Sequence, residues 1–161
     1  MKNLFLLFAF ISLSAVAQTV NPELLTKNWR AFWVYVPNTD PNDYGVYHFR
    51  KVLSLEAKPA TYVVHVSADN RYKLFVNGQL VSLGPARGDL YHWHYETVDI
   101  APYLQQGNNV VMATVWNDGK HKPLAQISSR TAFILQGDGK AESALNTNAS
   151  WKCVHDTAYA L

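Results

Sequence analysis

The sequence has very little cysteine, since Cys153 is the only one among 161 residues. A single thiol cannot form a disulfide within the chain, so the hydrophobic core must hold the fold together. No activating partner stands near Cys153 in the sequence, which argues against a nucleophilic cysteine. We interpret Cys153 as a packed or simply tolerated side chain.

The sequence also lacks a long apolar run beyond residue 17. Residues 1–17 begin with Met1-Lys2-Asn3, continue through an apolar stretch and end on Ala15-Val16-Ala17. This is the pattern of a secretory signal peptide cleaved after Ala17, and it is too short for a membrane span. We therefore expect an exported, soluble protein in a periplasmic or extracellular location, without a membrane span.

No block of one charge occurs either. The chain has 14 Lys and Arg against 12 Asp and Glu, and removal of Lys2 leaves 13 against 12. A nearly neutral chain without a basic patch argues against a nucleic-acid partner.

The 144 residues after Ala17 are enough for one domain with a substantial core. We expect residues 18–28 to be an N-terminal lead-in, 29–140 to be the folded domain and 141–161 to begin a linker to a missing following domain. Bulky residues continue to Leu161, as if the chain were cut through a larger protein.

Sustained helical periodicity is missing from the chain, except for a weak pattern over residues 22–31. Short runs rich in β-branched and aromatic residues alternate instead with turn signals, which predicts a mostly antiparallel, jelly-roll-like β-sandwich. The predicted strands are 49–55, 61–67, 72–76, 79–82, 92–98, 109–116 and 130–136, with a short helical turn over 99–104 capped by Asp99.

One hairpin has a specific signal. Asn77-Gly78 stands between the predicted strands 72–76 and 79–82, and this dipeptide accepts positive φ at both central turn positions. Within the strands, apolar residues predict the core at Val52, Leu53, Val64, Val66, Leu74, Val76, Val111, Ala113, Val115, Phe133 and Leu135.

Several further segments carry a family resemblance. They are Phe49–Lys51, Ala68–Tyr72, Leu74–Gly78, Gly84–Asp89, Trp93 with Tyr95–Asp99, Ala101–Leu104, Gly107–Val110 and Val115–Asn117, followed by Trp151-Lys152, Asp156 and Ala158-Tyr159. Together they resemble the N-terminal accessory domain of secreted α-L-rhamnosidases of glycoside hydrolase family 78, particularly those of gut Bacteroidetes. The motif over 84–89, followed by the run 93–99, is the most specific part of the resemblance.

The resemblance implies a galactose-binding-like jelly roll without catalytic residues. In that family the catalytic residues belong to a later α/α toroid, none of whose motifs occurs here, and the activity is inverting release of terminal L-rhamnose. The expected partners are therefore the catalytic domain of the same polypeptide and a rhamnose-containing glycan.

Loops beside the hairpin supply the residue types of a sugar site. An aromatic face covers the C–H side of a pyranose, while planar polar groups bind neighbouring hydroxyls. An ion pair between Arg87 and Asp89, or a core position for Trp93, would explain the same residues structurally. The candidates for binding either carbohydrate or the catalytic domain are Asp69, Asn70, Arg71, Arg87, Asp89, His92, Trp93 and Trp116.

Metal sites have weaker support, and we expect no cofactor. His92 and His94 have the i, i+2 spacing that chelates zinc on a strand, but no further ligand motif accompanies them. Asp40, Asn42 and Asp43 offer oxygens for calcium without forming a complete loop motif. His65 stands in a core-type strand, where a hydrogen-bonded interior histidine is the better interpretation.

Three functions follow in order of support. The first is a non-catalytic module packed on the catalytic domain of an α-L-rhamnosidase-like hydrolase, and the second is a free-standing carbohydrate-binding module. The third is a small enzyme using carboxylates among Asp89, Glu96 and Asp99, which only their proximity in the sequence supports. A missing partner also predicts exposed aromatic side chains, around residues 29–35 or at the C-terminal end.

Overall fold

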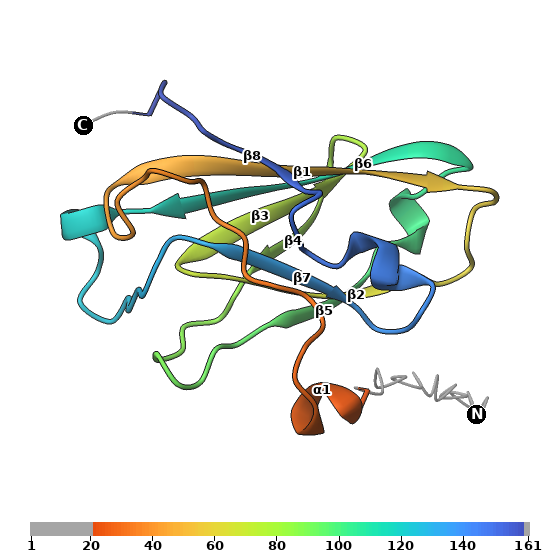
Figure 1. The fold of residues 1–161 in the computed structure, drawn as a ribbon, viewed down its shortest axis with the longest axis horizontal. Helices are drawn as coiled ribbons and strands as arrows, with labels where there is room; N and C mark the ends of the chain where they lie inside the picture. The colour runs from red at the N-terminus through yellow and green to blue at the C-terminus, as the bar shows by residue number, and fades with distance from the viewer. Residues whose placement is uncertain (1–20, 160–161) are drawn as a thin grey trace, which may run out of the picture.

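A computed structural model describes residues 21–159, so the predicted signal peptide and the start of the lead-in lie outside the described residues. Two antiparallel sheets pack face to face (Figure 1), which confirms the all-β sandwich. The strands are β1 (Gly45–Leu55), β2 (Val63–Ala68), β3 (Arg71–Val76), β4 (Gln79–Gly84), β5 (Glu96–Asp99), β6 (Gly107–Asn117), β7 (Phe133–Gly137) and β8 (Lys152–His155).

The sheets differ in size. One has five strands in the order β4-β3-β6-β1-β8, and the other has three in the order β5-β2-β7. The larger sheet is built on β1 and β6, which pair without interruption from Gly45 opposite Asn117 to Leu55 opposite Gly107. Side chains alternate between the two faces of a strand, so this register decides which residues face the core.

The predicted hairpin is confirmed at Asn77-Gly78. These residues join β3 to β4 with φ angles of 51° and 82°, the positive values that a tight hairpin turn of this kind requires. The Asn77 amide also donates to the carbonyl of Tyr103 and accepts the N–H of Val110, which attaches the turn to β6.

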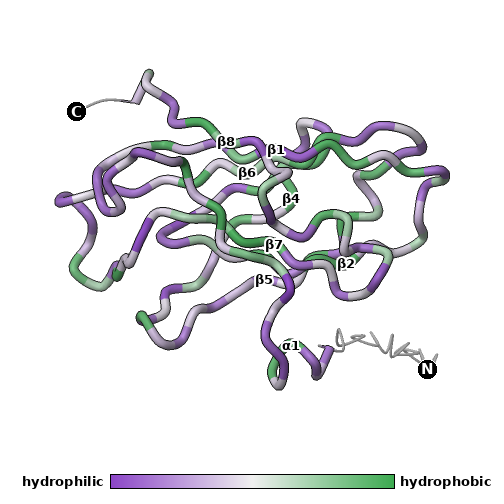
Figure 2. The backbone as a smooth tube through the Cα atoms, in the orientation of Figure 1, coloured by the Kyte–Doolittle hydropathy of each residue, from purple (hydrophilic) through white to green (hydrophobic). Residues whose placement is uncertain are grey.

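The predicted core is confirmed at every named position except Val52. Val52 is 46% exposed, whereas its neighbour Leu53 is 5% exposed. Since neighbouring residues of a strand point to opposite faces, Leu53 and Val52 could not both face the core. In Figure 2 hydrophobic residues occur in many short stretches rather than in one long segment, as this alternation requires.

The predicted linker over 141–161 is wrong for residues 141–155. Leu145 and Trp151 are buried in the core, and the Trp151 ring lies 5.5 Å from that of Phe133. The following strand β8 pairs with β1 from Tyr47 opposite His155 to Arg50 opposite Lys152. The sequence analysis missed β8 because four residues with only partial burial carry little periodic signal.

The helical elements are short. They are α1 (Glu23–Thr26) and the 3₁₀ turns η1 (Ala101–Tyr103), η2 (Gly119–His121) and η3 (Glu142–Leu145). Asp99 precedes η1 as predicted, and its carboxylate accepts the N–H groups of Ala101 and Tyr62. The predicted strand 92–98 is shorter than expected, since β5 begins only at Glu96. No helix within residues 21–159 has the length and apolar character of a membrane span.

The segment that leads into the sandwich runs alongside β7, an edge strand of the three-stranded sheet (Figure 1). Val34 forms a β-bridge with Phe133, and the Gln136 side chain accepts the N–H groups of Arg30 and Ala31. The Trp29 ring lies over His65, at 6.3 Å between ring centroids. The segment therefore acts as part of the domain.

His65 is the buried, hydrogen-bonded histidine that the sequence predicted. It is fully buried, and its ring nitrogens lie 3.0 Å from the Thr97 hydroxyl and 3.0 Å from the Asp138 carboxylate. Burial lowers the pKa of His65, although hydrogen bonding to Asp138 partly opposes the effect.

We expect Phe133→Ala to lower the free energy of unfolding by about 3–5 kcal/mol, because it leaves a cavity among fully buried side chains. Val52→Ala is the matched control and should cost well under half as much, since half-exposed Val52 contributes little burial. Urea denaturation followed by tryptophan fluorescence measures both. Equal losses for the two variants would contradict the register of β1.

Acidification should reduce stability below the ordinary histidine pKa of about 6.5. Because His65 has a lowered pKa in the folded state, the unfolded chain binds the proton more readily there, and stability falls as pH falls. His65→Gln should flatten this slope between pH 7 and pH 5, measured by urea denaturation at each pH. An unchanged slope in the variant would assign the pH dependence to other groups.

Candidate functional site

Two segments far apart in sequence present aromatic and apolar side chains side by side. One of these side chains, Trp93, is only partly exposed, and the others have exposed fractions from 38% for Trp33 to 89% for Tyr91. Residues 29–35 were predicted to be exposed, and the structure confirms this for Phe32, Trp33 and Tyr35. We call the set the aromatic surface; it consists of Phe32, Trp33, Tyr35, Leu90, Tyr91 and Trp93.

The two segments meet at the pair of Trp33 and Trp93, whose ring centroids are 5.5 Å apart at 60°. Beside this pair lies a hollow of about 270 Å³, lined also by Tyr35, Asp69 and Arg130. The Arg130 guanidinium lies 4.5 Å from the centre of the Tyr35 ring, within cation–π range. Trp33 and Trp93 also line a second hollow of about 590 Å³.

The motif over residues 84–89 ends in a turn that presents the most exposed part of this surface. The Asp89 carboxylate accepts the N–H groups of Tyr91 at 2.7 Å and His92 at 2.9 Å, and it pairs with the His92 ring at 2.9 Å. Gly88 is required because a Cβ there would lie 2.2 Å from the His92 carbonyl oxygen. These contacts close the turn and leave Tyr91 pointing outward.

Asp69 organises the floor of the smaller hollow. It is 2% exposed, and its carboxylate accepts the N–H groups of Ser129 at 2.6 Å and Arg130 at 2.5 Å. Burial raises the pKa of Asp69, and the backbone hydrogen bonds partly offset that rise. Its partners lie about 60 residues away in the chain, so Asp69 positions Arg130 rather than meeting a ligand directly.

The two residues that follow Asp69 also serve to shape the loops rather than to meet a ligand. Asn70 occupies the turn between β2 and β3 with a φ of 77°, and its buried amide oxygen has no partner within residues 21–159. The Arg71 guanidinium donates to the carbonyl of Pro85, which attaches the loop over 84–89 to β3.

The remaining candidates separate in space. Arg87 is exposed, and Asp89 pairs with His92 rather than with Arg87, the partner in the structural alternative to a sugar site. Trp116 lies on the five-stranded sheet and faces away from the core, with the Lys73 ammonium 5.9 Å from its ring centre. The eight candidates therefore do not form one site: Asp69 and Trp93 line the smaller hollow, while Trp116 belongs to another face.

The sequence analysis missed Leu90, Ser129 and Arg130 as residues of this site. Arg130 was assigned to a strand, but β7 begins only at Phe133. In the sequence, only the polar residues around Arg130 could have suggested a place in the site. Its contacts with Asp69 and Tyr35 arise only in the folded chain.

Metal and thiol chemistry gains no support from the geometry. Within residues 21–159 no three potential ligands among His, Cys, Asp and Glu gather around a common point. Asp40 accepts the N–H of Asn42 in a local turn, and His92 and His94 lie in a loop rather than on one strand face. Burial raises the pKa of Cys153, which disfavours its thiolate.

Comparison with known proteins shows to which family the chain belongs. The model of the α-L-rhamnosidase N-terminal domain matches residues 57–159. The chain belongs to this family. A search of curated protein sequences gave no significant match.

Solved structures show the same fold for this rhamnosidase N-terminal domain. A family 78 rhamnosidase of Bacillus sp. GL1 is similar over 80% of this chain and 14% of its own, with 24% identity and a TM-score of 0.71. An α-L-rhamnosidase from Dictyoglomus thermophilum is similar over 79% and 17%, with 18% identity and a TM-score of 0.60. A Pleurotus ostreatus lectin is similar over 80% and 35%, with 18% identity and a TM-score of 0.56. The chain thus spans a small part of the rhamnosidases that it resembles.

Asp69→Ala should lower the free energy of unfolding by about 3 kcal/mol, since two backbone N–H groups lose a charged acceptor in a buried place. Asp69→Asn keeps one acceptor and should cost less. Urea denaturation measures stability, and amide hydrogen exchange at Ser129 and Arg130 should accelerate in both variants. Unchanged exchange at these two amides would contradict the positioning role of Asp69.

Proposed function

We propose that this rhamnosidase N-terminal domain is a non-catalytic module that packs its aromatic surface against the catalytic domain of a longer α-L-rhamnosidase-like polypeptide. The observation that carries the proposal is the aromatic surface itself. A contiguous group of exposed aromatic side chains marks an interaction site in a folded protein. Aromatic residues and arginine are also enriched in the cores of protein interfaces, and Arg130 lies beside Tyr35 here.

The construction of the surface supports a rigid docking face. Hydrogen bonds that Arg30 and Ala31 donate to the Gln136 side chain fix residues 30–31, and the turn at Asp89 fixes residues 89–92. Asp69 fixes the backbone that carries Arg130. A preorganised surface loses little conformational entropy on association, so its apolar area contributes more fully to binding.

The carboxylates that the sequence suggested for catalysis have structural roles. Asp89 closes its own turn, Asp99 binds the N–H groups of Tyr62 and Ala101, and Glu96 accepts the N–H of Ala86 at 3.3 Å. Glycoside hydrolysis by inversion needs one acid and one base facing the same bond. These three groups are committed to backbone contacts, which supports the non-catalytic assignment.

Two further parts of the proposal rest on the sequence. The pattern over residues 1–17 supports export to a periplasmic or extracellular location. The resemblance of the motifs supports an origin among enzymes of the Bacteroidetes type. In this proposal the whole protein releases terminal L-rhamnose from a rhamnose-containing glycan, and this domain supports the catalytic part.

Binding in trans tests the proposal. The 161-residue chain and the polypeptide encoded directly after Leu161 would be purified separately and mixed for isothermal titration calorimetry. We expect a complex that Tyr91→Ser and Phe32→Ser each weaken at least tenfold, because both remove exposed apolar contact area.

Leu83→Ser is the matched control, since Leu83 is 59% exposed but lies on the five-stranded sheet. It should leave the affinity unchanged. The proposal fails if both parts are folded and form no complex, if Leu83→Ser weakens binding as much as Tyr91→Ser, or if the reading frame stops at Leu161.

A further inference from the structure

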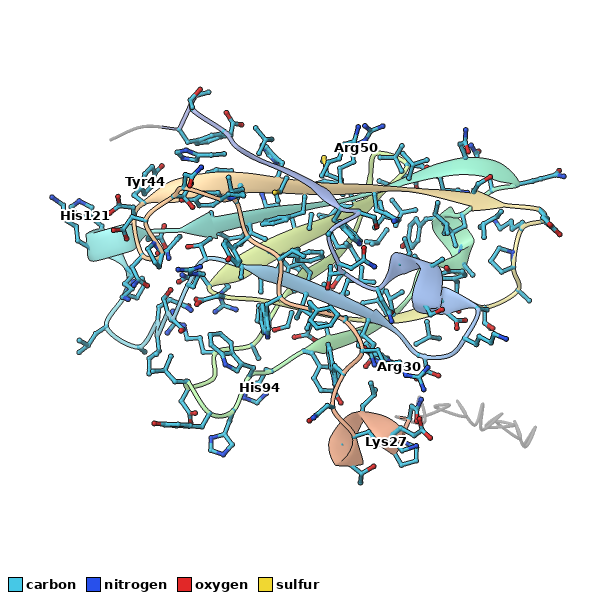
Figure 3. All side chains as sticks on the ribbon, in the orientation of Figure 1. Lys27, Arg30, Tyr44, Arg50, His94 and His121 are labelled. Carbon is cyan, nitrogen blue, oxygen red and sulfur yellow. The ribbon has the colours of Figure 1, made fainter. Side chains whose placement is uncertain are left out.

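Another hollow, which shares no lining residue with those beside the aromatic surface, lies on the outer face of the five-stranded sheet. Its volume is about 270 Å³, and both apolar and charged side chains line it. Figure 3 shows Tyr44 beside this sheet and His94 on the opposite side of the sandwich. We call this hollow the Trp116 groove; the residues that line it include Tyr44, Lys73, Thr114, Trp116, Asp118 and Tyr159.

The register of the sheet explains why these side chains share a face. Thr114 and Trp116 are two residues apart on β6, so they point to the same side, whereas Ala113 and Val115 are fully buried. Lys73 of β3 lies opposite Thr114. The register of β6 therefore places Trp116 on the outer face of the sheet, where its ring does not contribute to the core.

The segment after β8 completes one wall of the groove. Asp156 donates its N–H to the Val46 carbonyl at 2.8 Å, and its carboxylate accepts the N–H of Ala158 at 3.0 Å. The other carboxylate oxygen lies 3.0 Å from the His48 ring, whose second nitrogen lies 3.1 Å from the Thr114 hydroxyl. These contacts hold the turn that brings Tyr159 to the groove.

The chemistry of the lining favours one class of ligand. Aromatic rings cover the C–H face of a pyranose, while an ammonium, a carboxylate and a hydroxyl meet its hydroxyl groups as donor, acceptor or both. A purely apolar ligand would bury Lys73 and Asp118 without partners, and an anion would face Asp118. Both signs of charge beside an aromatic ring suit a neutral, polyhydroxylated ligand.

The size of the groove and the position of Lys73 agree with this class. A volume of about 270 Å³ lies just below the range of pockets for drug-sized ligands, roughly 300–1,000 Å³, and suits one or two sugar rings. The Lys73 ammonium is 5.9 Å from the Trp116 ring centre, near the outer limit of cation–π contact at about 6 Å. Its exposed side chain is free to turn toward a ligand hydroxyl and uncover the ring.

We propose that the Trp116 groove binds a neutral saccharide, with one pyranose ring stacked on Trp116 and its hydroxyls bound by Lys73, Asp118 and Thr114. This site is independent of the docking function proposed above, because it uses the other sheet. With this site the domain would bind a glycan on one sheet while the aromatic surface binds its protein partner.

Saturation-transfer difference NMR on the 161-residue chain tests the site. The probes are L-rhamnose, D-galactose, D-glucose and a neutral rhamnose-containing disaccharide at millimolar concentration, with D-galacturonate as the anionic comparison. We expect transfer to at least one neutral sugar and at least a tenfold loss of affinity in Trp116→Ala, the equivalent of about 1.4 kcal/mol.

Leu124→Ala is the control, since Leu124 is exposed, lines neither the Trp116 groove nor the aromatic surface, and should leave sugar binding unchanged when replaced. Trp116→Phe, Asp118→Asn and Lys73→Ala keep the test informative if Trp116→Ala does not fold, and each should weaken binding. Circular dichroism confirms folding of every variant.

Three results would overturn the proposal. They are no transfer to any neutral sugar by the folded chain, transfer that persists in the Trp116 and Asp118 variants, and transfer to galacturonate alone. A groove that binds no sugar but becomes protected when the polypeptide after Leu161 is added would identify a protein contact instead. None of these results affects the complex measured with Tyr91→Ser.

Discussion

The uninterrupted pairing of β1 with β6 is the constraint on which the other features depend. Eleven consecutive residues of each strand are in register, so the orientation of every side chain on both strands is decided together. This register directs Phe49, Ala113 and Val115 into the core and leaves His48, Thr114 and Trp116 outside. A shift by one residue would exchange these sets and abolish both the core and the Trp116 groove.

The unequal sheets give the domain two different outer surfaces. The three-stranded sheet is flanked by residues 29–36, which place Trp29 against His65 and present Phe32, Trp33 and Tyr35 of the aromatic surface. The five-stranded sheet keeps an open outer face, where single polar and aromatic side chains line a shallow groove. A broad apolar surface suits a protein partner, whereas a small mixed groove suits a sugar, so the two proposals follow from one architecture.

Local signals predicted most of the fold. Runs rich in β-branched and aromatic residues between turn signals identified most of β1, β2, β3, β4 and β6, and Asn77-Gly78 identified the hairpin between β3 and β4, because these features depend on neighbouring residues alone. Val52 was assigned to the core together with Leu53 because both are apolar, although neighbouring strand residues point to opposite faces, and β8 was missed since it depends on pairing with a distant strand. The site was predicted less well for the same reason: Arg130 reaches Tyr35 and Asp69 only through the folded chain.

The account's central claim is that the aromatic surface is an interface with a following catalytic domain. Hydroxyl-radical footprinting with mass spectrometry would compare oxidation of Phe32, Trp33 and Tyr91 in the 161-residue chain and in a polypeptide extended beyond Leu161. The account predicts strong protection of these three side chains in the longer protein, with Leu83 on the other sheet oxidised equally in both. Equal oxidation of Phe32, Trp33 and Tyr91 in the two proteins would contradict it.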